Sequence, residues 1–229
     1  YTQRHTMAKK ETPRTTLDEL NEGLSSLEQK MEKNKKNIYY VAAAIVVVAV
    51  LICGYIYGVR NPGIEKAKAA IAKADIEMVM GNDSVALQQY EAVAKDYSNS
   101  PANRAALNAA IILFQKGKYQ EAADYVKKFS AKGTLVGPAS QSLLGDCLVN
   151  LDKLDEAIAA FDKAVSLSDD NPLYTPLFLI KKATVLREQK NYKAEAECYQ
   201  TIKDKYPEFQ GSYNVDVEKY LERALAQAE

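Results

Sequence analysis

The sequence predicts an all-α protein in which a single transmembrane helix precedes a solenoid of about four helix-turn-helix repeats and a capping helix. Two observations predict this fold: an uncharged apolar run near the N-terminus, and rows of small and aromatic side chains recurring at steps of 36, 35 and 38 residues. The composition, 47% hydrophobic and 26% charged, is that of a globular protein. We therefore expect a tail at 1–37, a span at 38–59, repeats at 60–211 and a capping helix at 212–229.

The tail contains a short amphipathic pattern. Apolar residues alternate there at steps of three and four, which places them on one helical face: Leu17, Leu20, Leu24, Leu27 and Met31. Two heptads are too few for an independent coiled coil. The helix is therefore expected either to lie on the membrane surface or to dock on a partner protein.

Residues 38–59 carry no charge and include eleven Ile, Leu or Val residues. As a helix the run is about 33 Å long, enough to cross a hydrocarbon core of about 30 Å. A cleaved signal peptide is disfavoured because the run is long, lies far from the N-terminus and is not followed by a small-residue cleavage site. A lipoprotein signal is disfavoured because Ile52 precedes Cys53. The run thus predicts an uncleaved span in the lipid bilayer.

Lysines crowd the N-terminal flank of this run, and fewer basic residues follow it. The flanking residues are Lys30, Lys33, Lys35 and Lys36 before the run, and Arg60, Lys66 and Lys68 after it. Since positive charge accumulates on the cytoplasmic side, this bias predicts a cytoplasmic N-terminus, with residues 60–229 outside the cytoplasm.

Gly54 and Gly58 form a G-x-x-x-G pattern at the outer end of the span. Such a pattern lets two spans approach closely and would support a homodimer. Alternatively, the two glycines have this spacing by chance and do not indicate a dimer.

Beyond residue 64, three rows of residues stay in register. Small residues form the first row: Ala74, Ala110, Gly145 and Ala183. Twelve positions later come Ala86, Ala122, Ala157 and, out of pattern, Glu195. Four further on come Tyr90, Val126, Phe161 and Tyr199. Two antiparallel helices pack closely where small side chains meet, and an aromatic ring fills the space beside them. The second helices of three pairs are expected to begin at Tyr119, Leu154 and Tyr192.

This pattern resembles the tetratricopeptide repeat, whose signature is a small residue, then A-x-x-x-F, then proline, at a period near 34. Pro207 stands where the family proline belongs. The resemblance implies repeats at about 67–101, 102–136, 138–172 and 176–209. Glu195 and Lys182 depart from the pattern in the fourth repeat.

The resemblance also implies a concave, protein-binding surface lined by the first helix of each repeat. In this geometry the surface residues are Asp75, Met78, Arg104, Leu107, Ile111, Phe114, Ser142, Asp146, Asn150, Ile180, Thr184 and Arg187. Ile111 and Phe114 are the expected peptide anchors, with Arg104 and Arg187 as carboxylate partners. In the alternative reading Leu107 and Ile111 are ordinary core. The Lys/Asn/Lys/Arg clamp that binds chaperone tails is missing at these positions, which argues against a co-chaperone role.

Enzymatic function is disfavoured. The single histidine is His5, so the foldable region has no histidine base or ligand. No nucleophile–base pair, phosphate-binding loop or metal cluster is present, and we expect no catalytic residue, no cofactor and no metal. Cys147 and Cys198 are expected to be buried free thiols. Thirty basic residues balance thirty acidic ones, which gives no footprint for nucleic acid.

The layout of tail, span and repeats over residues 7–229 resembles the YfgM-like family of bacterial inner-membrane proteins. That resemblance implies an ancillary subunit of the Sec translocon, with the repeats in the periplasm. Its expected partners are translocon subunits, periplasmic chaperones and exported proteins. A scaffold for an envelope assembly of the Tol–Pal or outer-membrane-biogenesis type is the alternative. A mitochondrial import receptor is disfavoured by the lysine bias and the missing clamp.

Overall fold

The computed structural model describes residues 24–25, 32–129, 136–209 and 215–229. The chain divides into two compact units, Tyr1–Arg60 and Asn61–Glu229. Apart from Leu24 and Ser25, the amphipathic helix expected in the tail lies outside the described residues.

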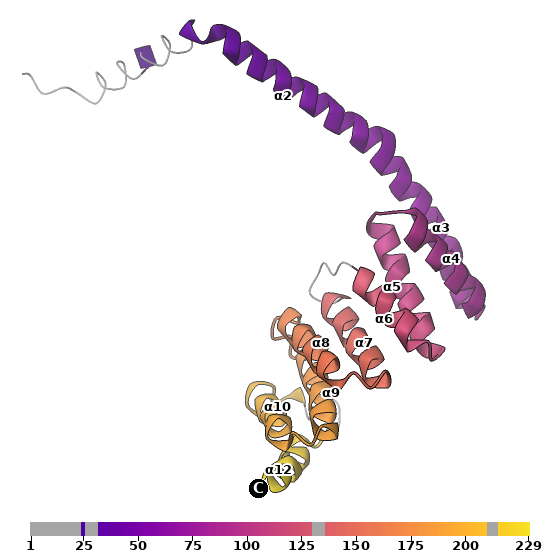
Figure 1. The fold of residues 1–229 in the computed structure, drawn as a ribbon, viewed down its shortest axis with the longest axis vertical. Coiled ribbons are helices and arrows are strands. Elements are labelled where there is room, and N and C mark those ends of the chain that lie inside the picture. The colour runs from indigo at the N-terminus through magenta and orange to yellow at the C-terminus, as the bar shows by residue number, and fades with distance from the viewer. Residues whose placement is uncertain (1–23, 26–31, 130–135, 210–214) are drawn as a thin grey trace, which may run out of the picture. The chain divides into compact units, whose positions relative to one another are not determined.

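The described part of the first unit is one apolar helical segment. Helix α2, Lys35–Tyr55, is followed by a π-helical turn, Ile56–Arg60 (Figure 1). An 18-residue window here has a mean hydropathy of 2.5, and none of it is buried. By length and composition the helix can cross a membrane, although a signal sequence near an N-terminus meets the same criteria. The structure therefore shows one long apolar N-terminal helix that includes the predicted span.

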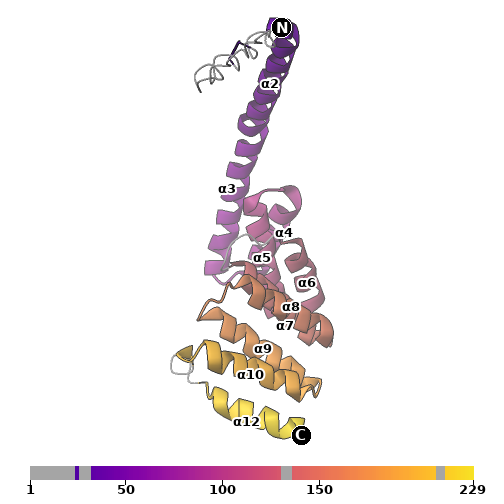
Figure 2. The same cartoon turned by 90° about the vertical axis from the view of Figure 1, so that its left-hand side faces the viewer.

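The described part of the second unit consists of helical pairs stacked one on the next (Figures 1 and 2). The pairs are α3, Asn61–Val79, with α4, Asp83–Asp96; α5, Ser100–Gln115, with α6, Tyr119–Lys128; α7, Val136–Asn150, with α8, Leu154–Leu167; and α9, Tyr174–Glu188, with α10, Tyr192–Lys205. The final helix α12, Val217–Ala228, packs on α10 through Val217, Leu221 and Ala224. The predicted all-α helical-repeat fold is confirmed.

Small residues allow the two helices of each pair to approach closely. The alanines of the first two rows are completely buried: Ala74, Ala86, Ala110, Ala122, Ala157 and Ala183. At Gly145 there is no space even for a methyl group, because a Cβ added there would lie 2.5 Å from the Phe161 ring. The small residue of the first helix and the aromatic residue of the second thus meet as the sequence pattern predicts.

The turn inside each pair contains one residue in the left-handed backbone region, seven positions after the small residue. These residues are Gly81, Gly117, Asp152 and Lys190, with φ of 78°, 74°, 57° and 58°. The following N–H reaches back five residues, as in the 2.9 Å bond from Lys118 N to Leu113 O. Such a bond closes the end of the first helix and fixes where the second begins. Three second helices begin at Tyr119, Leu154 and Tyr192, as predicted.

Candidate functional site

The candidate surface is formed by residues of the first helices. The structure places the predicted residues on four helices: Asp75 and Met78 on α3; Arg104, Leu107, Ile111 and Phe114 on α5; Asp146 and Asn150 on α7; Thr184 and Arg187 on α9. Two ion pairs join neighbouring first helices and involve three of these residues, Asp75, Arg104 and Asp146.

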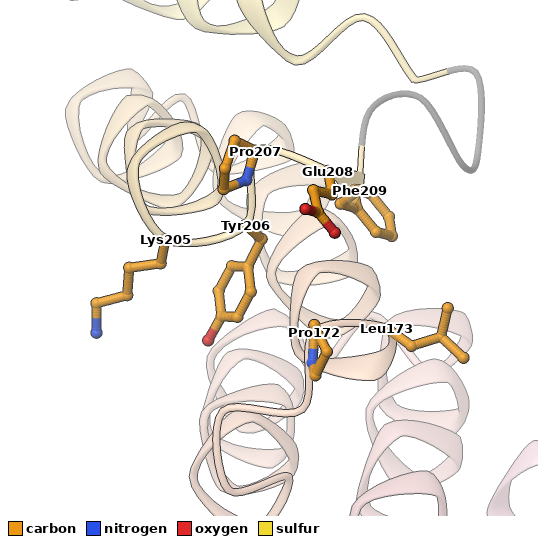
Figure 3. A pocket seen from close by; sticks show the side chains of 7 residues that line it. All are labelled: Pro172, Leu173, Lys205, Tyr206, Pro207, Glu208 and Phe209. Carbon is orange, nitrogen blue, oxygen red and sulfur yellow. The ribbon is translucent and has the colours of Figure 1, made fainter.

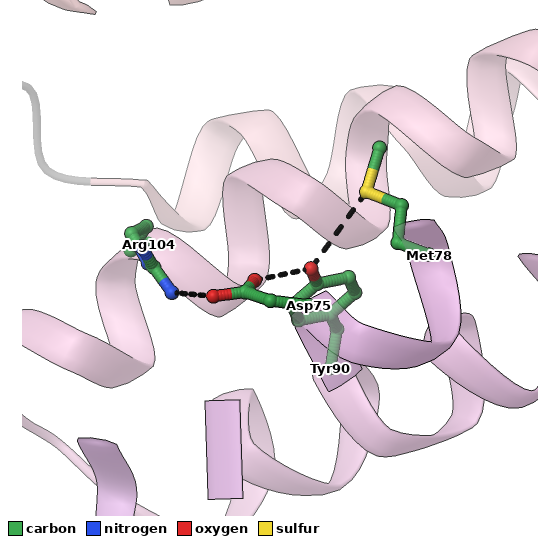
Figure 4. A network of polar contacts seen from close by, with 4 residues as sticks. All are labelled: Asp75, Met78, Tyr90 and Arg104. Atoms are coloured by element: carbon green, nitrogen blue, oxygen red, sulfur yellow. Dashed lines mark hydrogen bonds and ion pairs between the residues drawn. The ribbon is translucent and has the colours of Figure 1, made fainter. Parts of the chain in front are cut away.

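The first ion pair belongs to a network around Asp75 (Figure 4). Tyr90 of α4 donates a 2.5 Å hydrogen bond to Asp75 Oδ1, and Arg104 of α5 lies 2.5 Å from Asp75 Oδ2. The Tyr90 hydroxyl also lies 3.7 Å from the sulfur of Met78. Burial and the hydrogen bond to Asp75 raise the pKa of Tyr90 to about 12. One carboxylate thus connects α3, α4 and α5.

The second ion pair joins α7 and α9. Lys181 Nζ lies 2.5 Å from Asp146 Oδ2 and donates a 3.1 Å hydrogen bond to Ser142 Oγ. Burial raises the pKa of Asp146 above its usual value, although the Lys181 ammonium acts in the opposite direction. Asn150 donates a 2.8 Å bond to the backbone carbonyl of Asp146. The Asp146 carboxylate thus connects α7 with α9.

Between these ion pairs in chain order lies an apolar strip on α5. Leu107 and Ile111 follow Arg104 by three and seven residues, so they share the helix face that Arg104 turns towards α3. Both are partly exposed. Phe114 continues the strip, but its ring packs edge-on against Tyr119 at 5.4 Å between centroids. The strip is apolar surface that the repeat leaves partly open to solvent.

On α9, Thr184 Oγ1 donates a hydrogen bond to the backbone carbonyl of Ile180 at 3.0 Å. Arg187, partly exposed, forms no ion pair among the described residues. Of the two arginines expected to bind carboxylates, Arg104 is thus already paired and Arg187 is not.

Lys181 and Tyr90 contact predicted surface residues, Asp146 and Asp75, although the sequence did not single them out. Asp146 and Lys181 are 35 residues apart, three fewer than the step of 38 from Gly145 to Ala183, so they do not occupy matching positions in their repeats. The repeat spacing therefore gave no signal for Lys181. Tyr90 belongs to the predicted aromatic row, but nothing in the row reveals that its hydroxyl reaches Asp75.

A separate hollow of about 430 Å³ lies beside the end of α10 (Figure 3). Its lining is mixed, with two prolines, aromatic rings and two charged side chains: Pro172, Leu173, Lys205, Tyr206, Pro207, Glu208 and Phe209. The Tyr206 hydroxyl is bound to Asp170 at 2.9 Å. The hollow therefore offers contact surface, and its lining contains no nucleophile–base pair.

Within the described residues, no group of three His, Cys, Asp or Glu side chains is arranged to hold a metal ion. Cys147 and Cys198 are buried and free. Burial raises the pKa of each thiol to about 11, so neither is an activated nucleophile at neutral pH.

The family comparison matches the repeats. Residues 71–134 and 129–172 match the sequence model described as Tetratricopeptide repeat. No curated protein matches the chain.

Solved structures share the fold at low sequence identity. A MamA crystal structure is 19% identical, with a TM-score of 0.53, and the alignment covers 71% of this chain and 88% of MamA. YrrB, described as a TPR protein with an unusual peptide-binding site, is 17% identical, with a TM-score of 0.50 and coverages of 69% and 80%. TPR-like repeats related to a kinesin light chain of Podospora anserina are 14% identical, with a TM-score of 0.53 and coverages of 82% and 96%.

These likenesses establish the fold, and the sequence match identifies the kind of repeat at residues 71–172. Tetratricopeptide repeats are protein-binding scaffolds that typically have no enzymatic activity. Residues 71–172 thus match the tetratricopeptide repeat in sequence, and the small-residue rows, left-handed turns and stacked helical pairs of the described residues agree with that match.

Proposed function

We propose that this protein is a membrane-anchored adaptor that binds segments of other proteins along the groove of its first helices. The partly exposed strip of Leu107 and Ile111 is the observation that carries the proposal. Partly exposed apolar side chains provide surface whose burial by a bound segment favours binding.

The charges of the groove support an apolar mode of recognition. Asp75 is bound to Arg104 and Asp146 to Lys181, so both carboxylates are neutralised by the protein itself. A bound segment gains most from burying apolar side chains on Leu107 and Ile111. Arg187, which has no ion-pair partner among the described residues, is the group proposed to bind an acidic side chain or a terminal carboxylate.

The apolar helix supplies the anchor in this proposal. Residues 38–59 span the bacterial inner membrane, the lysine-rich tail is cytoplasmic and the repeats face the periplasm. In this place the protein serves the Sec translocon as an ancillary subunit and binds newly exported proteins or periplasmic chaperones. A scaffold for an envelope assembly of the Tol–Pal or outer-membrane-biogenesis type is the alternative.

In-cell photocrosslinking tests the groove and identifies the partners. A photoreactive residue replaces Ile111 in the full-length protein, and a matched control carries it at Lys127, on the exposed surface of α6. The proposal expects crosslinks from position 111 to translocon subunits, chaperones or exported proteins, and a loss of these crosslinks in Leu107→Asp. Equal crosslinking at both positions would overturn the groove assignment. Crosslinks at position 111 to Tol–Pal or outer-membrane-assembly proteins would favour the scaffold.

Cysteine labelling tests the membrane topology. A cysteine placed at exposed Lys127, in a chain whose own cysteines are replaced by serine, should react with a membrane-impermeant maleimide in intact spheroplasts. Protection that is lost only after the membrane is permeabilised would place the repeats in the cytoplasm.

A further inference from the structure

The outer face of α3 is an unfilled interface between repeats. Every later first helix packs against the second helix of the preceding pair: α5 on α4, α7 on α6 and α9 on α8. Helix α3 packs on α4 and α5. Because α3 belongs to the first pair, no earlier pair of the repeat unit covers its other side.

The position of Ile76 within the repeat corresponds to residues that are buried between helices in the later repeats. Ile76 lies two residues after the small residue Ala74, and the matching residues of the later repeats are Ile112, Cys147 and Val185. These three are 1%, 0% and 3% exposed, whereas Ile76 is 56% exposed. Val185 shares a core cluster with three residues of α8, the preceding second helix: Ala157, Ala160 and Phe161. Ile76 therefore has the chemistry of an interface residue without the helix that would cover it.

Ala69, about two helical turns before Ile76, leads to the same conclusion. It is exposed, while its counterparts in the later repeats are all buried: Ala105, Ser140 and Phe178. Ala69 and Ile76 are seven residues apart and so lie on one face of α3.

Lys73, between them, indicates the charge of the missing helix. It occupies the same repeat position as Lys182, one residue before the small residue. On α9, Lys182 pairs at 2.5 Å with Asp162 of α8, the preceding second helix. Lys73 is exposed and has no ion-pair partner among the described residues. A helix that covered α3 as α8 covers α9 would bring an acidic residue to Lys73.

The end of α3 extends the apolar surface beyond this shared pattern. Val79 and Met80 are 88% and 61% exposed. Their counterparts at the ends of the later first helices are mostly polar: Gln115 and Lys116, Asn150 and Leu151, Glu188 and Gln189. At the end of its first helix, the first repeat thus exposes apolar side chains at positions where the later repeats have mostly polar ones. Met80 adds a flexible side chain that adapts to varied partners.

We propose that the face formed by Ala69, Lys73, Ile76 and Val79 of α3, with Met80 directly after the helix, binds an amphipathic helix of another protein. The helix takes the place of a preceding second helix and pairs an Asp or Glu with Lys73. The template is α8, whose Ile158 and Val165 pack against the core cluster that includes α9, on either side of Asp162. The expected partner motif is therefore apolar-x3-acidic-x2-apolar on one helix face. This surface is separate from the groove and does not depend on the function proposed for it.

A synthetic peptide of residues 154–168, which carries the α8 motif, is the probe. Its binding to the full-length protein in nanodiscs of neutral lipid is measured by fluorescence anisotropy. Lys73→Glu and Ile76→Asp should each weaken binding about tenfold or more, whereas Lys127→Glu on α6 should leave it unchanged. A peptide with Asp162→Lys should bind Lys73→Glu about as tightly as the original peptide binds the unmodified protein.

The exchange of charges between Lys73→Glu and the Asp162→Lys peptide distinguishes binding at this face of α3 from binding elsewhere on the protein. Peptide binding that is insensitive to Lys73→Glu and Ile76→Asp would overturn the proposal, because the peptide would then have entered elsewhere, for example by displacing α8. Disulfide-linked dimers of Ile76→Cys, formed in a chain whose own cysteines are replaced by serine, would also overturn it, since a second copy would then cover the face. Both altered residues are exposed, and an unchanged circular dichroism spectrum confirms that the variants are folded.

Discussion

Glu195 of α10 and Arg223 of α12 form an ion pair with 2.6 Å between Oε1 of the carboxylate and Nη2 of the guanidinium. Glu195 has no exposed surface, and the Arg223 side chain is one third exposed. The guanidinium also lies over the ring of Tyr220, which stacks on Tyr199. The glutamate at this alanine position thus makes a specific connection between the fourth repeat and the capping helix.

Removing either partner should destabilise the protein, but unequally. Arg223→Ala leaves a fully buried carboxylate without its cation, and we expect it to lower the free energy of unfolding by about 3 kcal/mol. Glu195→Ala leaves an arginine that can still reach water and restores the family residue, so its cost should be about 1 kcal/mol. Urea denaturation of the detergent-solubilised protein, followed by circular dichroism, measures both values.

The double variant Glu195→Ala/Arg223→Leu serves as the control. Replacing a buried ion pair by apolar side chains is often neutral, so the double variant should be more stable than Arg223→Ala alone. If Glu195→Ala proves the more damaging single change, the ion pair is not what holds the capping helix.

The rows of small and aromatic residues could be identified from the sequence because the same helix–helix packing recurs in each repeat. Gly145 meets Phe161, and the second helices begin at Tyr119, Leu154 and Tyr192, since spacing within one repeat fixes these relations. The partner of Glu195 could not be predicted, because Arg223 lies 28 residues away on a helix outside the repeat pattern.

For the predicted surface residues, the sequence indicated which helix carries each one but not which of them form ion pairs. Asp75 and Arg104 were both named as surface residues, yet nothing in their spacing of 29 residues, shorter than a repeat, indicated an ion pair. The Lys181–Asp146 pair is separated by 35 residues, three fewer than the local repeat step of 38, so aligning the repeats would not have identified it either. Whether these residues bind a peptide stays a prediction.

Gly145→Ala should destabilise the third repeat. The new methyl group would overlap the Phe161 ring, which is 1% exposed and cannot move out of the core. Overpacking of this kind costs about 1–3 kcal/mol, against which the better helix propensity of alanine returns about 1 kcal/mol. We expect a net loss of about 1 kcal/mol, measured by urea denaturation.

Gly63→Ala on α3 is the matched control, because a Cβ there meets nothing within 4 Å. It should be neutral or slightly stabilising. The double variant Gly145→Ala/Phe161→Leu should recover part of the loss, and a strictly additive result would show that the ring is not the obstacle.

Lys190→Gly should stabilise the fourth repeat. Lys190 adopts φ of 58° in the turn before α10, where the first two repeats have glycine. A left-handed conformation costs a side-chain-bearing residue about 1–2 kcal/mol, and the extra freedom of glycine in the unfolded chain offsets about half of this. The expected gain is about 0.5–1 kcal/mol in thermal or urea denaturation.

Asp152→Gly should give a smaller gain, because aspartate tolerates this region better than lysine. The reverse change, Gly117→Lys, should cost about 1 kcal/mol. An unchanged stability in all three variants would mean that these turns relax to another conformation.

Tyr90 should make the protein sensitive to alkali. Its pKa is raised from 10.0 to about 12 by burial and by the hydrogen bond to Asp75. Above pH 10 the unfolded chain releases this proton while the folded protein keeps it, so stability falls as the pH rises from 10 towards 12. Below pH 10 both states hold the proton, and this contribution is fully present.

Tyr90→Phe separates the two contributions of the hydroxyl. At pH 7 the loss of its hydrogen bond to Asp75 should cost about 1 kcal/mol. Between pH 10 and 12 the variant should lose stability less steeply than the unmodified protein, because one group with a raised pKa is gone. A residual slope is expected, since burial also raises the pKa of Tyr125, Tyr199 and Tyr206.

Tyr192→Phe, at the partly exposed start of α10, is the control for removing a hydroxyl. If the two variants lose stability with equal steepness in urea titrations at pH 9, 10 and 11, Tyr90 is not a source of the alkaline sensitivity.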